Sequence, residues 1–364
     1  MRAAVMRSGR IEVAEVEDPQ PQTGEVLVKT LACGICGSDL HALQHGPEMV
    51  AASAEAGLPT FRMDLERDVV MGHEFCAEVV GHGAGCKHRL PVGTRVCAMP
   101  IGLRQGVRAS VGYSNDLPGG YGELMLLQES LLLEVPNALE SDRAALTEPM
   151  AVGVHAVEMA RLAPGDLPLV VGCGPVGLAV IAALRGRGVE PIVASDFSPR
   201  RRELALLMGA HEVVDPAQGE PMATWMAAAY LPPEEAPERA SELAFLPTMP
   251  ALRPAVIFEC VGVPGIIDSL MKQAPPFARI VVVGVCMERD RVHPFFGISR
   301  QLNLQFVLGY TPEEFSGTLR DIAEGTLDVA PMITGSVGVD EVADAFDWLA
   351  TPDRHAKIVV EPWR

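Results

Sequence analysis

The chain has 364 residues, of which 48% are hydrophobic and 21% are charged. This composition excludes an intrinsically disordered chain, because such a chain cannot bury enough apolar surface to offset the entropy lost on ordering. The formal net charge of −18 at pH 7 repels phosphate backbones and anionic lipids, so we expect neither nucleic acid nor a membrane surface as a partner.

The N-terminus and the cysteines predict a cytoplasmic protein. The segment MRAAVMRSGRIEVAEVEDP lacks the continuous apolar core of a signal peptide. The eight cysteines are scattered along the chain, which favours free thiols or metal ligands over a disulfide framework. Residues 167–184 form an uncharged stretch as long as a membrane span, but its glycines and prolines have the order of a turn.

The first third of the chain has the pattern of short strands separated by turns. EVLVKTLACG (25–34) alternates apolar and polar residues, FCAEVVGHG (75–83) is a second strand-and-turn unit, and TRVCAMP (94–100) resembles a third. This spacing predicts a compact, mostly antiparallel β domain.

From about residue 167 the pattern changes to buried strands. The apolar runs are PLVVGCG, PIVASD, EVVD, AVIFECVG and RIVVVGV, and helical patterns such as RRELALLMG lie between some of them. Apolar strands that alternate with helices predict a parallel sheet covered on both faces. The chain ends with a helical pattern, DEVADAFDWLA, and a strand, HAKIVVEP. This end can complete the first domain, which makes the parallel-sheet domain an insertion.

The segment between residues 215 and 255 carries eight prolines, several glutamates and one apolar patch, MATWMAAAY. Loops of this length inside a domain are uncommon, and they tend to be functional or mobile. We interpret the segment as a solvated insertion, with a lid or a subunit contact as the alternative.

The sequence LVVGCGPVGL holds a G-x-G-x-x-G array formed by Gly172, Gly174 and Gly177, with Pro175 and Val176 inside it. The array follows an apolar run and opens a helical one, which is the context of a dinucleotide-binding turn. The first glycine permits the tight turn, the second lets a pyrophosphate approach the backbone, and the third permits close helix packing. The helix N-terminus then faces the phosphates.

Asp196 ends the next strand, 19 positions after Gly177, close to the spacing of about 20 expected for a ribose-binding carboxylate. It would accept hydrogen bonds from the ribose hydroxyls and repel a 2′-phosphate, which favours NAD over NADP. Arginines can pair with a 2′-phosphate, but we interpret Arg200, Arg201 and Arg202 as a solvated helix face, with Arg201 kept as a cofactor-binding candidate. The alternative for the whole array is an ordinary glycine-rich turn beside an incidental aspartate.

Three motifs carry residue types that bind metals: GICGSDLH with Cys36, GHE with His73 and Glu74, and LTEPMAVGVHA with Glu148. Catalytic zinc takes three protein ligands from Cys, His and carboxylate, and it keeps one position open. Cys36 as a thiolate, His73, and either Glu74 or Glu148 make such a set. Zinc in this set would lower the pKa of an alcohol.

Each motif alone has a plainer interpretation. A His-Glu pair on an apolar strand is usually structural. Cys33 and Cys36 form a C-x-x-C, which suggests a redox pair or half a zinc ribbon, but the sequence has no second C-x-x-C and no thioredoxin-like context. We therefore interpret Cys33 as a small buried residue.

As an ordered set, the motifs are far more specific. The succession GICGSDLH, GHE, PGGYGELMLL, TEPMAVGVHA and VVGCGPVGL, followed by SD, resembles zinc-dependent medium-chain alcohol and polyol dehydrogenases, and HAKIVVEP resembles the usual family ending. The resemblance thus spans nearly the whole chain. It implies an α/β fold in which a Rossmann doubly wound parallel sheet (residues 151–298) is inserted in a mostly-β GroES-like catalytic domain (residues 1–150 and 299–364).

The resemblance implies roles for the metal-binding residue types. Cys36 and His73 match two zinc positions of the family, and Glu74 matches a glutamate that ligates the metal or lies beside it. Glu148 stands where other alcohol dehydrogenases have a second cysteine, as in the sorbitol, threonine and glucose dehydrogenase branches, where it binds zinc directly or through water. Many relatives also hold a structural zinc with four cysteines, but this chain has only Cys97 in that lobe. We expect one zinc per subunit.

Further roles follow from the same resemblance. Ser38 matches the hydroxyl that hydrogen-bonds the substrate alcohol and starts proton removal, and His41 matches a relay group that delivers the proton to solvent. Asp39 resembles the carboxylate that fixes the tautomer of a ligand histidine. Backbone at residues 261–263 and 285–286 should border the nicotinamide, so Val261 and Val285 are cofactor-binding candidates.

The implied activity is hydride transfer between a secondary alcohol or polyol, or the corresponding ketone, and NAD(H). One alternative is a zinc-free enone or quinone reductase that uses NADPH, and another is an inactive nucleotide-binding relative. We expect residues 45–70 to border the entrance of the substrate pocket. The resemblance also implies a homodimer or homotetramer, often joined through an edge strand near residues 301–309.

Overall fold

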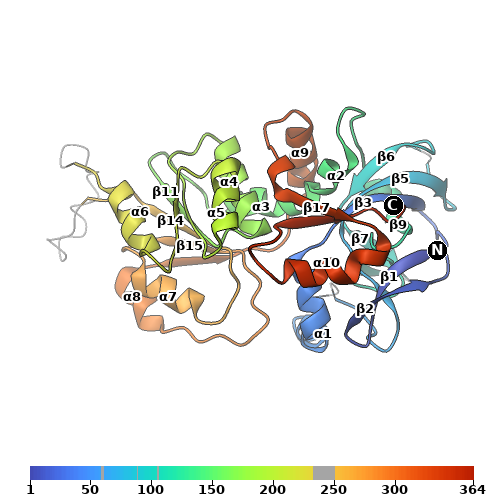
Figure 1. Cartoon of the computed structure of the whole chain (residues 1–364), viewed down its shortest axis with the longest axis horizontal. Helices are drawn as coiled ribbons and strands as arrows, with labels where there is room; N and C mark the ends of the chain where they lie inside the picture. Colours follow the sequence, from blue (N-terminus) through green and yellow to red (C-terminus); the bar gives the residue numbers. More distant parts are fainter. Residues whose placement is uncertain (59–60, 88, 105, 233–250) are drawn as a thin grey trace. The chain divides into compact units, whose positions relative to one another are not determined.

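The structure is a computed structural model that describes residues 1–58, 61–87, 89–104, 106–232 and 251–364. The chain forms two compact units. The first comprises Met1–Ala151 and Tyr310–Arg364, and the second comprises Val152–Gly309. The second unit is therefore an insertion in the sequence of the first. The earliest strands (blue in Figure 1) and the last elements (red) belong to the same unit.

A seven-stranded sheet forms the centre of the first unit, in the order β10-β6-β5-β3-β18-β17, with β9 also paired to β3. Its strand pairs are antiparallel except for β17 with β18, which confirms the mostly antiparallel β fold expected here. The strands are β3 (Glu25–Gly34), β5 (Glu74–His82), β6 (Arg95–Ala98), β9 (Leu124–Gln128), β10 (Leu132–Glu134), β17 (Ile333–Val337) and β18 (Lys357–Val360).

Smaller sheets and helices complete the first unit. One sheet has the order β2-β1-β4, and β7 pairs with β8 in a hairpin. The strands are β1 (Arg2–Arg7), β2 (Arg10–Glu15), β4 (Val69–Val70), β7 (Ile101–Arg104) and β8 (Val107–Ser110). The helices are α1 (Gly37–Glu55), α2 (Ser141–Ala145), α9 (Pro312–Ala323) and α10 (Val342–Leu349), with short 3₁₀ turns η1 (Glu129–Leu131), η4 (Ala330–Met332) and η5 (Val339–Glu341).

Helix α1 covers much of the segment expected to border the substrate pocket. It runs on to Glu55 and kinks at His45, where φ is −128° and ψ is 27°. Pro47 follows this kink, and a proline inside a helix removes a hydrogen bond and clashes with the preceding turn. Residues 59 and 60 of that segment lie outside the described residues.

The second unit is a six-stranded parallel sheet in the order β13-β12-β11-β14-β15-β16. Numbered within the unit, this is the 3-2-1-4-5-6 order of the Rossmann fold, which confirms that prediction. The strands are β11 (Leu167–Val171), β12 (Val193–Ser195), β13 (Glu212–Val214), β14 (Ala255–Glu259), β15 (Arg279–Val282) and β16 (Asn303–Phe306). The helices are α3 (Thr147–Met159), which begins in the first unit, α4 (Pro175–Gly186), α5 (Pro199–Met208), α6 (Pro221–Ala229), α7 (Ile266–Gln273) and α8 (Pro294–Arg300).

The apolar patch of the proline-rich segment forms helix α6 and is not solvated. Met222, Trp225 and Ala229 lie on one face of α6, are buried, and belong to the core of the second unit. The indole nitrogen of Trp225 donates to the carbonyl of Leu167 in β11 at 3.0 Å. Residues 233–250, most of the remaining insertion, lie outside the described residues.

The second boundary of the inserted unit differs from the expected one. The sequence places it after residue 298, whereas the compact unit continues to Gly309. The reason is β16, whose four residues pair in parallel with Arg279–Val282 of β15 and so belong to the Rossmann sheet. Residues 167–184 form β11, a turn and most of α4. Among the described residues, no helix is long and apolar enough to cross a membrane.

Candidate active site

The glycine array forms the turn between β11 and α4. Gly172 has a φ of +91°, in the left-handed region of the backbone that glycine adopts more readily than other residues. A β-carbon on Gly177 would overlap the carbonyl oxygen of Gly172, so the third glycine permits the close packing of helix on turn. At Gly174 the nearest atoms to an added β-carbon belong to Arg201, 3.9 Å away. Helix α4 starts with Pro175 directly after this open position, which leaves its N-terminus available to a phosphate group.

Asp196 directly follows β12 and closes the same turn. Its Oδ2 accepts a hydrogen bond from the backbone N–H of Cys173 at 2.8 Å, and its Oδ1 accepts one from Ser198 at 2.8 Å. Each carboxylate oxygen has a further lone pair. The backbone thus holds the carboxylate beside the glycine turn with capacity left for ribose hydroxyls.

The three arginines after Asp196 have different surroundings. Arg200 pairs with Glu203 at 3.1 Å on the exposed helix face. Arg202 donates to the carbonyls of Asp196 and Phe197, both at 2.8 Å, and therefore supports the turn. Arg201 lies 4.0 Å from the Asp196 carboxylate, and its buried Nε has no hydrogen-bond partner among the described residues. Arg201 is the arginine that faces the glycine turn.

The residues expected beside the nicotinamide lie at the carboxyl ends of neighbouring parallel strands. Val261 follows β14 and Val285 follows β15, and both are exposed. A β-carbon on Gly262 would come within 2.7 Å of the backbone of Val285, so glycine lets the two loops approach each other. Ligands of open α/β sheets bind outside this edge.

In the first unit, one cluster of metal-binding groups forms where β3 ends and β5 begins. Cys36 precedes α1, His73 precedes β5 and Glu74 opens it. Their ligand atoms all lie within 4.8 Å of one another. The β3–β5 register, in which Gly34 pairs with Glu74, brings these distant segments together.

His73 is backed by a buried carboxylate. Its Nδ1 lies 3.5 Å from Oδ1 of Asp39, which is fully buried. Burial lowers the pKa of His73, but attraction to Asp39 and Cys36 outweighs it and raises that pKa well above its ordinary value. For Asp39, burial raises the pKa, but the charge of His73 and the hydrogen bonds that the carboxylate accepts lower this pKa overall. The carboxylate therefore stays ionised behind the imidazole.

Asp39 is held by four groups. Its Oδ2 accepts from the hydroxyl of Tyr121 at 2.6 Å and from the backbone N–H of Cys36 at 3.0 Å. Its Oδ1 lies 2.8 Å from the hydroxyl of Tyr113 as well as near His73. Neither tyrosine was among the residues predicted from the motifs.

Glu74 forms a buried ion pair that the motifs did not reveal. Lys357 Nζ donates to both Glu74 carboxylate oxygens at 2.7 Å and to the carbonyl of Ile35 at 2.9 Å. Lys357 and Glu74 are fully buried. A β-carbon on Gly34 would overlap the Glu74 carboxylate, so Gly34 makes room for it. The feature of the sequence that could have indicated this ion pair is the lysine in the otherwise apolar strand KIVV.

Glu148 lies outside the group of mutually close ligand atoms found among the described residues. It sits in the first turn of α3, and its Oε1 accepts a hydrogen bond from the hydroxyl of Tyr310 at 2.8 Å. Burial raises the pKa of Glu148, and the nearby Glu74 charge adds to this, against the lowering influence of His73. Tyr310 was also missed in the sequence.

The two proton-relay candidates follow Cys36 on α1. Ser38 Oγ lies 2.8 Å from the hydroxyl of Tyr113. His41 is half-buried, and its Nδ1 has no hydrogen-bond partner among the described residues. Burial lowers the pKa of His41, and the charge of His45 lowers it further. A neutral imidazole with a free nitrogen can accept a proton.

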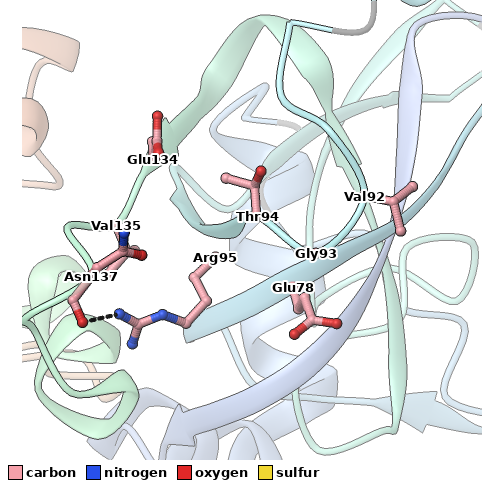
Figure 2. A pocket seen from close by; sticks show the side chains of 8 residues that line it. All are labelled: Glu78, Val92, Gly93, Thr94, Arg95, Glu134, Val135 and Asn137. Atoms are coloured by element: carbon pink, nitrogen blue, oxygen red, sulfur yellow. Dashed lines mark hydrogen bonds between the residues drawn. The ribbon is translucent and has the colours of Figure 1, made fainter.

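A separate hollow of about 430 Å³ opens elsewhere on the first unit (Figure 2). The guanidinium of Arg95, which lines it, donates to the carbonyls of Pro136, Asn137 and Leu139. This arginine thus serves to hold the chain that leads into α2. None of the predicted site residues lines the hollow, which is formed by Glu78, Val92, Gly93, Thr94, Arg95, Glu134, Val135 and Asn137.

Comparison with known proteins agrees with these features. The chain matches two family models, the alcohol dehydrogenase GroES-like domain at residues 22–137 and the zinc-binding dehydrogenase at residues 175–324. It is 29% identical to (R,R)-butanediol dehydrogenase of Bacillus subtilis (97% of this chain, 96% of the relative) and 25% identical to sorbitol dehydrogenase of the same organism (100% and 98%). A solved dehydrogenase structure from Sinorhizobium meliloti, bound to NADP, superimposes with a TM-score of 0.77 at 25% identity over 99% of both chains.

The chain belongs to the zinc-type medium-chain alcohol and polyol dehydrogenases. It is an oxidoreductase that acts on CH–OH groups with zinc and a nicotinamide cofactor. The thiol, imidazole and carboxylate of the cluster are the donor types of catalytic zinc, so the residues present fit this metal.

Proposed function

We propose that the chain catalyses the NAD-linked oxidation of a secondary alcohol or polyol to the ketone, and the reverse, at a single zinc site formed by Cys36, His73 and Glu74. The observation that carries this proposal is the convergence of their ligand atoms within 4.8 Å. The bond from Lys357 leaves each Glu74 oxygen a lone pair, so the ion pair and metal binding are compatible.

Cys36, His73 and Glu74 would hold the zinc ion, which would supply the Lewis acidity that lowers the pKa of the alcohol, and the nicotinamide cofactor would supply the hydride chemistry. Ser38 accepts the alcohol proton, and His41 passes a proton on to solvent. Asp39 holds the His73 imidazole in one tautomer. Glu148, held by Tyr310, is the further polar group of the site and acts on the metal directly or through water.

For the cofactor we propose NAD in preference to NADP. The Asp196 carboxylate beside the glycine turn would repel a 2′-phosphate, which supports NAD. Arg201 would favour NADP, because the end of its guanidinium lies 3.9 Å from an added β-carbon on Gly174 and its buried Nε has no hydrogen-bond partner among the described residues. Val261 and Val285 would border the nicotinamide at the edge of the sheet.

Several broader expectations are part of the same proposal. We propose one zinc per subunit, because this chain has only Cys97 in the lobe where many relatives hold a structural zinc with four cysteines. We propose a cytoplasmic enzyme, because a Cys36 ligand requires a reduced thiol. The apolar side chains exposed around the edge strand β16 support a homodimer or homotetramer; they include Phe295, Ile298, Phe306 and Leu308.

One set of measurements tests the function. The purified protein is analysed for zinc and assayed with butane-2,3-diol, sorbitol, other secondary alcohols and hydroxy acids, each with NAD and NADP. We expect about one zinc per chain and an alcohol-dependent rise in NADH absorbance. A protein without zinc that reduces enones with NADPH would contradict the proposal, as would a zinc protein that oxidises none of these alcohols.

A Glu148→Ala variant measured alongside decides the role of that carboxylate. Loss of zinc would show direct ligation, whereas retained zinc with lost activity would show a role through water. If zinc and activity both stay intact, Glu148 is not part of the site.

A further inference from the structure

Tyr113 joins two residues of the proposed mechanism and has no role in it so far. Its side chain is buried, and its hydroxyl lies 2.8 Å from Ser38 Oγ and 2.8 Å from Asp39 Oδ1. Ser38 is the group proposed to accept the alcohol proton, and Asp39 is the carboxylate behind His73. One phenol therefore connects the proton acceptor with the carboxylate that orients the imidazole.

The surrounding chain fixes this phenol in place. Tyr113 follows Gly112, which has φ of +82° and lies so close to Gly72 that an added β-carbon would come within 3.0 Å of its backbone. The loop is thus packed against the residue before His73. The Tyr113 carbonyl accepts from the N–H of Arg62 at 3.0 Å. The ring centroid lies 5.1 Å from that of His73, which limits its movement.

Counting protons gives the direction of the two hydrogen bonds. The phenol has one proton, and the Asp39 carboxylate can only accept. A hydrogen bond to an ionised carboxylate is roughly twice as strong as one between neutral groups, so Tyr113 donates to Asp39. The phenol oxygen is then the acceptor for Ser38, whose single proton points at Tyr113. Both lone pairs of Ser38 Oγ then face away from Tyr113.

We propose that Tyr113 is a positioning residue that fixes the rotamer and the hydrogen-bond direction of Ser38, so that Ser38 meets the substrate alcohol as an acceptor. This inference rests on the proposed function, in which an alcohol proton has to reach Ser38. Without the phenol, the Ser38 hydroxyl can rotate and offer its own proton to the alcohol oxygen, which is the wrong polarity for oxidation.

The proton balance of the step is simple. The alcohol O–H bond breaks as a new O–H bond forms at Ser38. The proton that Ser38 carried turns away from Tyr113 and leaves through His41. Tyr113 keeps its own proton throughout, so it positions Ser38 and does not join the relay.

Tyr121 is a matched control for the tests. Its hydroxyl donates to the other oxygen of Asp39 at 2.6 Å. Replacing either tyrosine with phenylalanine removes one hydrogen bond from the same carboxylate and keeps the ring. Only the Tyr113 hydroxyl also lies beside Ser38, so the difference between the two variants reports on Ser38.

The experiment is a pair of mutant cycles in the zinc-loaded enzyme. Tyr113→Phe and Tyr121→Phe are each made alone and with Ser38→Ala, and kcat and KM are measured with butane-2,3-diol or sorbitol and NAD. Zinc content and melting temperature are recorded for every variant. We expect Tyr113→Phe to lower kcat about tenfold with KM changed less than about threefold and zinc retained. In the Ser38→Ala background it should lower kcat only by the factor that Tyr121→Phe gives, because only its hydrogen bond to Asp39 is left to lose.

Tyr121→Phe acts through Asp39, so it should lower kcat by the same factor in the wild-type background and in the Ser38→Ala background. The inference is overturned if Tyr113→Phe leaves kcat unchanged, loses zinc, or lowers kcat equally in both backgrounds. A wild-type enzyme with zinc that oxidises no alcohol would reject the proposed function and this inference with it. An active wild-type enzyme with an unaltered Tyr113→Phe variant rejects the inference alone.

Discussion

At the scale of single residues, the site contains a buried ion pair between Lys357 and Glu74. Both side chains are fully buried, and their atoms lie 2.7 Å apart. Burial lowers the pKa of Lys357, but the Glu74 charge more than compensates and raises it. Removing one partner of such a pair leaves an uncompensated charge in a medium that solvates it poorly.

Lys357→Met should therefore destabilise the metal-free protein by about 3 to 5 kcal/mol. The measurement is urea unfolding followed by circular dichroism. The double variant Lys357→Met with Glu74→Gln is the control, because it removes both charges and should recover much of the loss. A single variant within about 1 kcal/mol of wild type would contradict this account.

Asp196 gives a prediction about cofactor choice. Asp196→Asn keeps the size of the side chain and removes the charge that repels a 2′-phosphate. We expect kcat/KM for NADP relative to NAD to rise about tenfold. Adding Arg201→Ala should reverse part of this gain, because Arg201 is the cation that faces the glycine turn. An unchanged ratio in Asp196→Asn would show that another residue selects the cofactor.

At the scale of elements, two glycines in the turn between β11 and α4 serve different purposes: Gly177 is needed for packing, and Gly174 is expected to leave room for the cofactor. A β-carbon at Gly177 has no room, whereas one at Gly174 meets only the end of a flexible arginine. The same substitution at two positions three residues apart therefore tests different properties.

Gly177→Ala should destabilise the second unit by about 3 kcal/mol, because helix and turn must separate. Gly174→Ala should leave the melting temperature nearly unchanged but weaken NADH binding, because the methyl group stands where the pyrophosphate approaches. Calorimetric melting and NADH fluorescence titration measure the two effects. The reverse order, with Gly174→Ala the less stable variant, would contradict the packing described.

At the scale of the whole molecule, the edge strand β16 of the Rossmann sheet is a candidate surface for contact between subunits. Among the described residues, strand β16 pairs with β15 alone, and Phe306 at its end is exposed. Exposed strand edges pair readily with other chains, and natural proteins protect them with charges such as lysine.

If the chain forms the proposed oligomer through this edge, Phe306→Lys should reduce it to monomers or weaken it strongly, as measured by size-exclusion chromatography with light scattering. Val13→Lys is a suitable control, because Val13 is an exposed apolar residue on β2 of the first unit. It should leave the assembly intact. An oligomer of unchanged mass in Phe306→Lys would place the interface elsewhere.

The sequence by itself was sufficient for the fold class and for the residue types of both binding regions. Alternating and continuous apolar runs predict antiparallel and parallel strands because they reflect which strand faces are buried. The glycine array and Asp196 were recognisable because their contacts are made within one β-α-β segment. The boundary near residue 298 was less accurate, since only pairing with β15 shows that β16 belongs to the sheet.

The tertiary structure alone decided how the site is held together. Lys357 meets Glu74 across 283 positions of the chain, and Tyr113 meets Ser38 across 75. No local pattern encodes such pairs, because a lysine in a strand or a tyrosine in a loop has many possible partners until β3, β5 and β18 come together. Local motifs indicated the candidate metal ligands, and long-range strand pairing selected the groups that contact them.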